Sequence, residues 1–169
     1  MELLLASKGW SKDDFAIASE LKSSEQIKAL CNKTVDAITF VVGHPNDSIK
    51  TAAATCDIII IGVTGGAVDK LVANNAYYQK NQIAGGLYDG NHDNIATFGV
   101  GSTVLASIHV SDNVIYQIVK ASLNNLEEFR QSHPAFIQLD AHKMVQGALI
   151  TPLHPGAEKA FTEAGIKLP

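Results

Sequence analysis

Two apolar runs in the first half of the chain predict buried β-strands. Residues 35–42 are almost entirely apolar after Asp36, and residues 57–63 include four consecutive isoleucines. Runs of this length without polar alternation are typical of strands that are covered on both faces in a parallel sheet. A glycine-containing loop follows each run, and helical spacing then begins, from about Asp47 to Ala54 and from Ala67 to Asn74. This alternation predicts an α/β fold.

The middle of the chain predicts a loop and then a long extended stretch. Residues 76–94 contain three glycines and a run of Asn and Asp, so we expect an ordered loop that is anchored by tyrosines. Residues 95–110 are extended in character and could span about 50 Å at about 3.3 Å per residue. Either two strands meet at the glycines within this stretch, or one strand crosses between two lobes.

The last third of the chain predicts helices. Ser111 is a suitable N-cap for a long helix, Pro134 ends that helical region, and a final helix begins at Pro155 and ends at Gly165. The long helical region has one apolar face that must be buried. The face consists of Val114, Ile115, Ile118, Val119, Leu126 and Phe129.

The first residues also predict helices and no export signal. Residues 3–6 are the end of a helix that Gly9 stops, and Ser23 with Gln26 forms the pattern of a capping box that opens another helix. A secretory signal has a basic start and a longer apolar segment, and the chain shows neither here. We therefore expect these residues to belong to the middle of something longer.

Composition narrows the class of function. The chain has 169 residues, 46% hydrophobic and 18% charged, with a net charge of −4 and scattered Lys and Arg, so nothing indicates binding to nucleic acid or to an anionic membrane. Cys31 and Cys56 fit no zinc or redox motif. We predict that they are two small buried hydrophobic side chains, and a disulfide in an oxidising compartment remains the alternative.

Two loops are the candidates for binding chemistry, because each follows a predicted strand and opens a helix. Ligands of parallel α/β sheets bind beyond the carboxyl ends of the strands, where helix N-termini offer free N–H groups to a carboxylate or phosphate. The alternative is a pair of well-formed turns without a ligand. Tyrosines could line the wall of such a pocket, or could anchor the loop to the core. The candidate binding residues are Gly43, His44, Asn46, Thr64 and Gly65, with Tyr77 and Tyr88 for the wall.

No pattern indicates catalysis, a metal or a cofactor. The six histidines have no metal-ligand spacing, and the chain contains neither of the glycine-rich nucleotide motifs nor a nucleophile elbow. We expect a binding protein and not an enzyme, with no cofactor and no metal ion.

Several segments together resemble the TAXI family of TRAP-transporter solute receptors. The match runs from about Gly9 to Ile166. Its segments are Val42-Gly43-His44-Pro45-Asn46, Tyr77-Tyr78 with Tyr88, Thr97-Phe98-Gly99-Val100, Val114-Ile115-Tyr116, His133-Pro134 and, above all, Pro152-Leu153-His154-Pro155-Gly156-Ala157. The resemblance implies a fold like periplasmic binding proteins, capture of a small carboxylate such as an amino acid, dicarboxylate or 2-oxoacid, delivery to the membrane components of a transporter, and a periplasmic location.

The resemblance also implies a division of the chain. Residues 1–95 would be part of the second α/β lobe, residues 96–110 a crossing strand or hinge, and residues 111–169 the C-terminal helical part of the first lobe, with the N-terminal half missing. The chain departs from the family at Ala76 and Ala84, where prolines are usual, and at Ala160-Phe161, where a tyrosine pair is usual. The alternative function is a degenerate fragment that acts only as an interaction or antigenic protein.

The missing half leads to a prediction about assembly. We expect the apolar helical face to be buried in a homodimer or by exchange of segments, with residues 95–129 at the contact. The alternative is a compact monomer in which the helix folds back on the first sheet.

Overall fold

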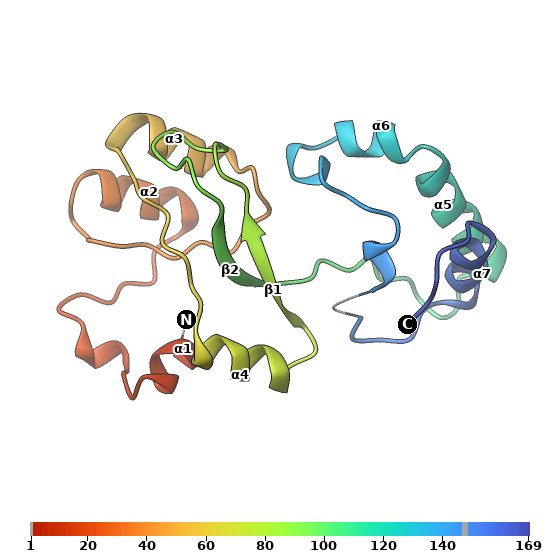
Figure 1. Cartoon of the computed structure of the whole chain (residues 1–169), viewed down its shortest axis with the longest axis horizontal. Helices are drawn as coiled ribbons and strands as arrows, with labels where there is room; N and C mark the ends of the chain where they lie inside the picture. The colour runs from red at the N-terminus through yellow and green to blue at the C-terminus, as the bar shows by residue number, and fades with distance from the viewer. Residues whose placement is uncertain (1, 147–148) are drawn as a thin grey trace. The chain divides into compact units, whose positions relative to one another are not determined.

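The computed structural model describes residues 2–146 and 149–169, and these residues form two compact units. Unit 1 comprises residues 2–74 and 80–99, and unit 2 comprises residues 75–79 with the described residues from 100 to 169. The chain combines helices with one small sheet of two strands (Figure 1). A mixed architecture of this kind is compatible with the predicted α/β class.

The helices of unit 1 largely begin and end where the sequence indicates. They are α1 (Glu2–Ser7), a 3-10 turn (Lys12–Asp14), α2 (Ser23–Cys31), α3 (Asp47–Cys56) and α4 (Gly66–Asn74). Gly9 follows α1 with a φ of 72°, the left-handed conformation expected of a glycine after a helix. The cap of α2 is one residue earlier than predicted, because the Glu25 carboxylate accepts a hydrogen bond from the Lys22 N–H at 3.1 Å.

The two-stranded sheet lies in a region that the sequence predicted only in part. Strand β1 (Tyr78–Ile83) pairs with β2 (Ile95–Val100), and the loop between them folds back on itself through a bridge between Tyr88 and Asn91. The prediction of a loop throughout residues 76–94 is wrong for β1. The sequence Tyr-Gln-Lys-Asn-Gln-Ile hides this strand because its middle is polar and exposed, so the usual alternation is absent.

The two apolar runs are extended segments, and the prediction that they form strands covered on both faces is wrong. Neither run is assigned as a strand, and Val41, Ile59 and Ile61 are 76%, 81% and 76% exposed. The β-branched residues favour extended backbone, but a strand also requires a neighbouring backbone with which to exchange hydrogen bonds. The side chains that point inward from these runs are Phe40, Val42, Ile58 and Ile60.

The core of unit 1 lies between these segments, α3 and the hairpin. Its buried members are Ile49 and Ala53 of α3, Ile83 of β1 and Tyr88 of the loop. The 57–63 segment lies against β2 so closely that a side chain at Gly62 would meet the Ala96 carbonyl oxygen at 2.9 Å. The absence of a Cβ at this position therefore permits the approach of the two backbones.

Asn91 is a buried polar residue that holds the hairpin loop on the 57–63 segment. Its side-chain Oδ1 accepts from the Ile60 N–H at 2.8 Å, and its Nδ2 donates to the carbonyl oxygens of Ile58 at 3.1 Å and Asp89 at 2.8 Å. The side chain is 7% exposed, and these bonds satisfy both ends of its amide. The amide of Asn91 thus bonds to the backbone groups of Ile58 and Ile60 that a neighbouring strand would otherwise pair with.

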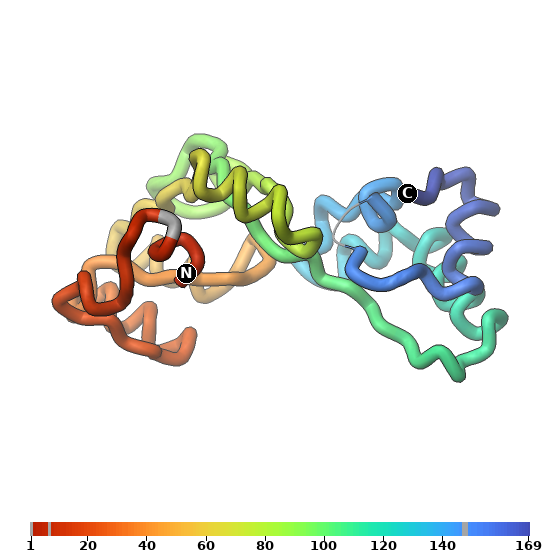
Figure 2. The backbone as a smooth tube through the Cα atoms, turned by 90° about the horizontal axis from the view of Figure 1, so that it is seen from below, coloured from red at the N-terminus to blue at the C-terminus, as the bar shows by residue number. Residues whose placement is uncertain are grey.

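Unit 2 is helical after an extended approach. Residues 101–107 have no regular secondary structure, and the backbone tube in Figure 2 makes no helical turns there. The elements that follow are α5 (Asp112–Asn124), α6 (Leu126–Gln131), two 3-10 turns (Pro134–Phe136 and Lys143–Val145) and α7 (Pro155–Glu163). Helices α5 and α7 pack on each other around Ile115, Val145, Ala157, Phe161 and Ile166.

The predicted apolar face of α5 divides into two parts. Ile115 is buried and Val119 packs beside it against the core of unit 2. By contrast, Val114 and Ile118 are 47% and 55% exposed, and Phe129 of α6 is exposed as well. One stripe of the helix therefore faces α7, and a second apolar stripe is left open on the described surface of this unit.

The segment Pro152 to Ala157 joins α7 to the start of α5. His154 precedes α7, and its Nδ1 accepts from the Gly156 N–H at 3.2 Å while its Nε2 lies 3.2 Å from the Val110 carbonyl oxygen. Pro155 occupies the first turn, where its missing N–H is harmless. Gly156 lies directly against the backbone of α5 at Asp112, where no side chain would fit.

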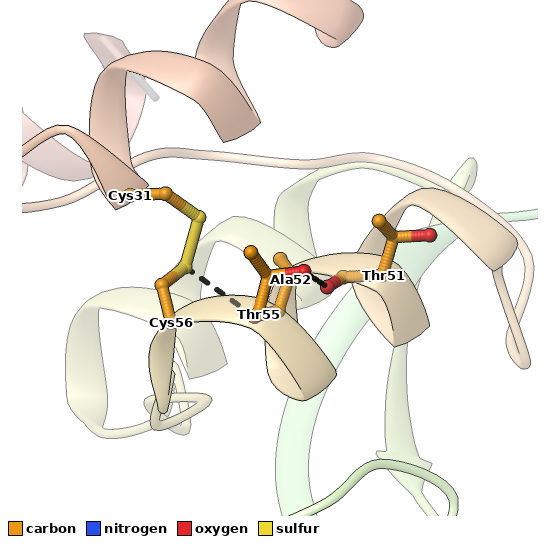
Figure 3. The surroundings of a disulfide bond; sticks show 5 residues. All are labelled: Cys31, Thr51, Ala52, Thr55 and Cys56. Carbon is orange, nitrogen blue, oxygen red and sulfur yellow. Dashed lines mark hydrogen bonds between the residues drawn. A yellow bond between two sulfur atoms is a disulfide. The ribbon is translucent and has the colours of Figure 1, made fainter.

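Cys31 and Cys56 form a disulfide that joins the ends of α2 and α3 (Figure 3). Their Cα atoms are 5.3 Å apart and their positions differ by 25 in the sequence. The prediction of two independent buried hydrophobic side chains is therefore wrong, because sequence spacing does not reveal that the two helix ends meet. Both residues are half-buried.

Among the helices that the structure describes, none has the length and apolar character needed to cross a membrane.

Candidate functional site

The loop 43–46 and the buried Tyr88 form the most connected polar group among the predicted site residues. The Tyr88 hydroxyl lies 2.7 Å from Nδ1 of His44 and accepts a hydrogen bond from the Asn46 N–H at 2.9 Å. The two rings meet edge to face, with centroids 5.8 Å apart. Tyr88 is 4% exposed, so a single phenol fixes both the backbone of the loop and the orientation of the imidazole.

Three of the predicted residues thus come together: His44, Asn46 and Tyr88. Asn46 also caps α3, since its Oδ1 accepts from the N–H groups of Ser48 at 3.1 Å and Ile49 at 3.3 Å. Gly43 precedes them, and the His44–Pro45 peptide bond is cis. The Oδ1 atom of Asn46 is therefore engaged in the cap, and the Nδ1 atom of His44 is engaged by the Tyr88 hydroxyl.

Burial sets the charge state of this group. Desolvation lowers the pKa of His44, so the neutral imidazole is favoured. Desolvation also raises the pKa of Tyr88, and the nearby Asp47 adds to that effect while the Asn46 hydrogen bond opposes it, so the phenol keeps its proton. The hydroxyl accepts from Asn46 and is bonded to Nδ1 of His44; when it donates its proton to Nδ1, the imidazole proton is on Nε2.

The second predicted loop is built differently. Thr64 and Gly65 are exposed and lead into α4, and Gly65 has a φ of 103°, a conformation that glycine adopts easily. The Gly65 carbonyl accepts from the Asp69 N–H at 3.0 Å, which starts the helix. In Figure 1, α3 and α4 lie toward opposite ends of unit 1, and no hydrogen bond between described residues joins the two loops.

Tyr77 belongs to unit 2 and packs on Tyr78, with ring centroids 4.6 Å apart. Its hydroxyl donates to Oδ1 of Asn75 at 2.9 Å. Both of these contacts are with residues of its own unit, and the side chain of Tyr77 is partly exposed.

Sequence reasoning missed Asn91, the buried amide that positions the loop carrying Tyr88. A single Asn in a run of Asn, Asp and Gly carries no signal that would distinguish it from a turn residue. Two open hollows of the described surface, one along Leu5 and Trp10 and one along Pro152 and Leu168, include none of the predicted site residues. Within residues 2–146 and 149–169, no group of three or more acidic, His or Cys side chains is placed to hold a metal ion.

Comparison with known families gives the class of the protein. Residues 1–165 match the model of a family that is like periplasmic binding proteins, which is a solute-binding type of protein. The chain belongs to this family, the NMT1-like family.

Proposed function

We propose that the chain acts as a solute receptor of a TRAP-type transporter, of the TAXI type, and captures a small carboxylate. Membership of the NMT1-like family supports the solute-binding role. The finer assignment rests on the resemblance of the segments Val42 to Asn46 and Pro152 to Ala157. The preferred ligands are amino acids, dicarboxylates and 2-oxoacids.

The observation that carries this proposal is the hydrogen bond between His44 and Tyr88. It holds the imidazole in one orientation, and burial favours the neutral form, so a His44 with its proton on Nε2 would offer an N–H donor that needs no charge. Gly43 allows a ligand to approach the backbone of the loop, and Thr64 with Gly65 would add donors at the second loop. Tyr88 acts by positioning His44, and Tyr77 is the weaker candidate for a wall of the pocket.

The proposed role is binding and not catalysis, with no cofactor and no metal ion. The proposed location is the periplasm, where the membrane components of the transporter would receive the ligand. The disulfide between Cys31 and Cys56 supports this location, because disulfides persist in oxidising compartments and are rare in the cytosol.

Isothermal titration with glutamate, 2-oxoglutarate and C4-dicarboxylates tests the proposal. We expect heat with at least one of these ligands, and at least about tenfold weaker binding in His44→Ala, the scale of a lost hydrogen bond to a charged group. His92→Ala is the matched control, since His92 is an exposed histidine in the same unit. A folded sample that gives no heat with any organic acid would refute the assignment.

The second candidate is an interaction protein without transport activity. It is favoured by the apolar side chains that the 101–110 region exposes, because Val104, Leu105 and Ile108 are 95%, 71% and 84% exposed. An interaction protein would bind a partner or an antibody through this region and would bind no organic acid. A receptor would bind an organic acid.

A further inference from the structure

The N-terminal part of unit 1 is attached to the surface and does not contribute to the core. None of residues 8–34 is buried, and α2 has no buried side chain along its length. The core of the unit consists instead of side chains from α3, the hairpin and the apolar runs. Residues 8–34 can therefore leave the unit without opening its core.

The non-covalent attachments of this segment are weak. Lys12 pairs with Glu2 of α1 at 2.9 Å, and both side chains are exposed to solvent. Exposed ion pairs of this kind add little to stability. The Trp10 N–H also donates to the Leu5 carbonyl oxygen of α1 at 2.9 Å. The contact of α2 with α3 is the attachment at which the disulfide between Cys31 and Cys56 lies.

Helix α3 separates the core from this attachment. Ile49 and Ala53, four residues apart, face the core. Ala52 and Cys56, also four residues apart, share another face of the helix, and Ala52 is fully buried. Helix α2 is bonded to α3 at Cys56, on that second face (Figure 3). The core contacts of Ile49 and Ala53 therefore do not depend on α2.

The site of the disulfide also accommodates the reduced state. The Sγ atom of Cys56 lies 3.3 Å from the Ala52 carbonyl oxygen, so a thiol formed there has a hydrogen-bond acceptor in the preceding turn. Both cysteines are half-buried, which leaves the bond within reach of a small thiol.

We propose that the Cys31–Cys56 disulfide is a redox-sensitive latch that holds residues 8–34 on unit 1. A dithiol reductant opens it by exchange: one thiolate of the reductant attacks a protein sulfur, and its second thiol displaces the mixed disulfide. The two protein sulfurs leave as thiols with two electrons and two protons, and the reductant becomes a cyclic disulfide. The oxidised chain keeps α2 on α3, and the reduced chain releases it while the core of unit 1 stays folded.

Hydrogen exchange of the full chain, with and without dithiothreitol, tests the latch. For a link between positions 25 apart, loop closure predicts that reduction lowers the protection of α2 by about 300-fold. Protection in α3, β1 and β2 should change by less than about threefold. Helices α5 and α7 of unit 2 serve as the internal reference.

The variant Cys31→Ser with Cys56→Ser is the matched control. It should show the exchange pattern of the reduced chain without reductant, and dithiothreitol should change nothing further. A fall in α2 protection of less than about tenfold on reduction would mean that packing alone holds the segment, and would overturn the proposal. Equal loss of protection in α3 and the sheet would also overturn it, because the disulfide would then stabilise the whole unit.

Discussion

Replacing Gly156 by alanine should drive α7 away from α5. A Cβ at this position would overlap the carbonyl oxygen of Asp112 and lie 2.9 Å from the amide nitrogen of Tyr116. Both are backbone atoms of α5, so no side-chain rotation can relieve the contact. The two helices must therefore separate, and the contact that forms the core of unit 2 must open with them.

The expected cost follows from what this contact buries. Forcing an extra methyl into a packed interface costs about 1–3 kcal/mol. Partial exposure of Ile115 and Phe161 adds to this, because full burial of each side chain is worth about 1.5–3 kcal/mol. We therefore expect unit 2 to lose about 3 kcal/mol, which lowers its Tm by about 15 °C for a unit of this size.

The assay is thermal unfolding by circular dichroism, with hydrogen exchange of α5 and α7 in urea to assign the transition to unit 2. Gly99→Ala is the control, because a Cβ there meets nothing within 4 Å and the residue is not in the left-handed region. A Tm of Gly156→Ala within about 3 °C of the Tm of the control would contradict the close approach of α7 to α5.

Three further predictions concern His44, Tyr88 and Ile118. Burial lowers the pKa of His44, so the unfolded chain binds the proton at a higher pH than the folded chain does. The contribution of His44 to the stability of unit 1 should be complete above about pH 6.5 and should fall at lower pH. Urea unfolding at several pH values should show a weaker pH dependence in His44→Gln. Tyr88→Phe leaves the Asn46 N–H and a ring nitrogen without their partner and should cost about 1–3 kcal/mol, whereas unchanged urea unfolding would contradict the hydrogen-bonded group. We also propose that the chain forms a homodimer or exchanges segments through residues 95–129. Sedimentation should show a dimer, and Ile118→Lys should dissociate that dimer because Ile118 is exposed. A wild-type mass of 18.0 kDa at micromolar concentration would exclude the dimer.

Local signals made most helices predictable. Asn46 caps α3 through its own side chain, and Pro155 and Gly165 bound the region of α7, so the information lies within a few residues of each end. Strands depend on partners far along the chain, which is why the prediction of a strand covered on both faces at residues 57–63 is wrong. The polar strand β1 gave no local signal at all.

In the candidate site, too, the sequence indicated residues within one loop but not their contacts with residues far along the chain. The sequence could nominate His44 and Asn46 because their loop opens a helix. It could not show that Tyr88, 44 positions beyond His44, would supply the hydroxyl that orients the imidazole. The sequence left the disulfide as an alternative and could not choose it for the same reason, since only the packing of α2 on α3 brings Cys31 to Cys56.

The glycine at position 62 decides which isoleucines of the 57–63 segment face the core. Residues 58–61 are all isoleucine, so a shift of one position would exchange Ile58 and Ile60 for Ile59 and Ile61 with no loss of apolar character. Hydrophobicity alone therefore leaves the register of this segment degenerate. Gly62 removes the degeneracy, because a shift of one position would replace it with Ile61 or Val63 and place a Cβ 2.9 Å from the Ala96 carbonyl oxygen. The amide of Asn91 then holds the backbone of Ile58 and Ile60 in this register.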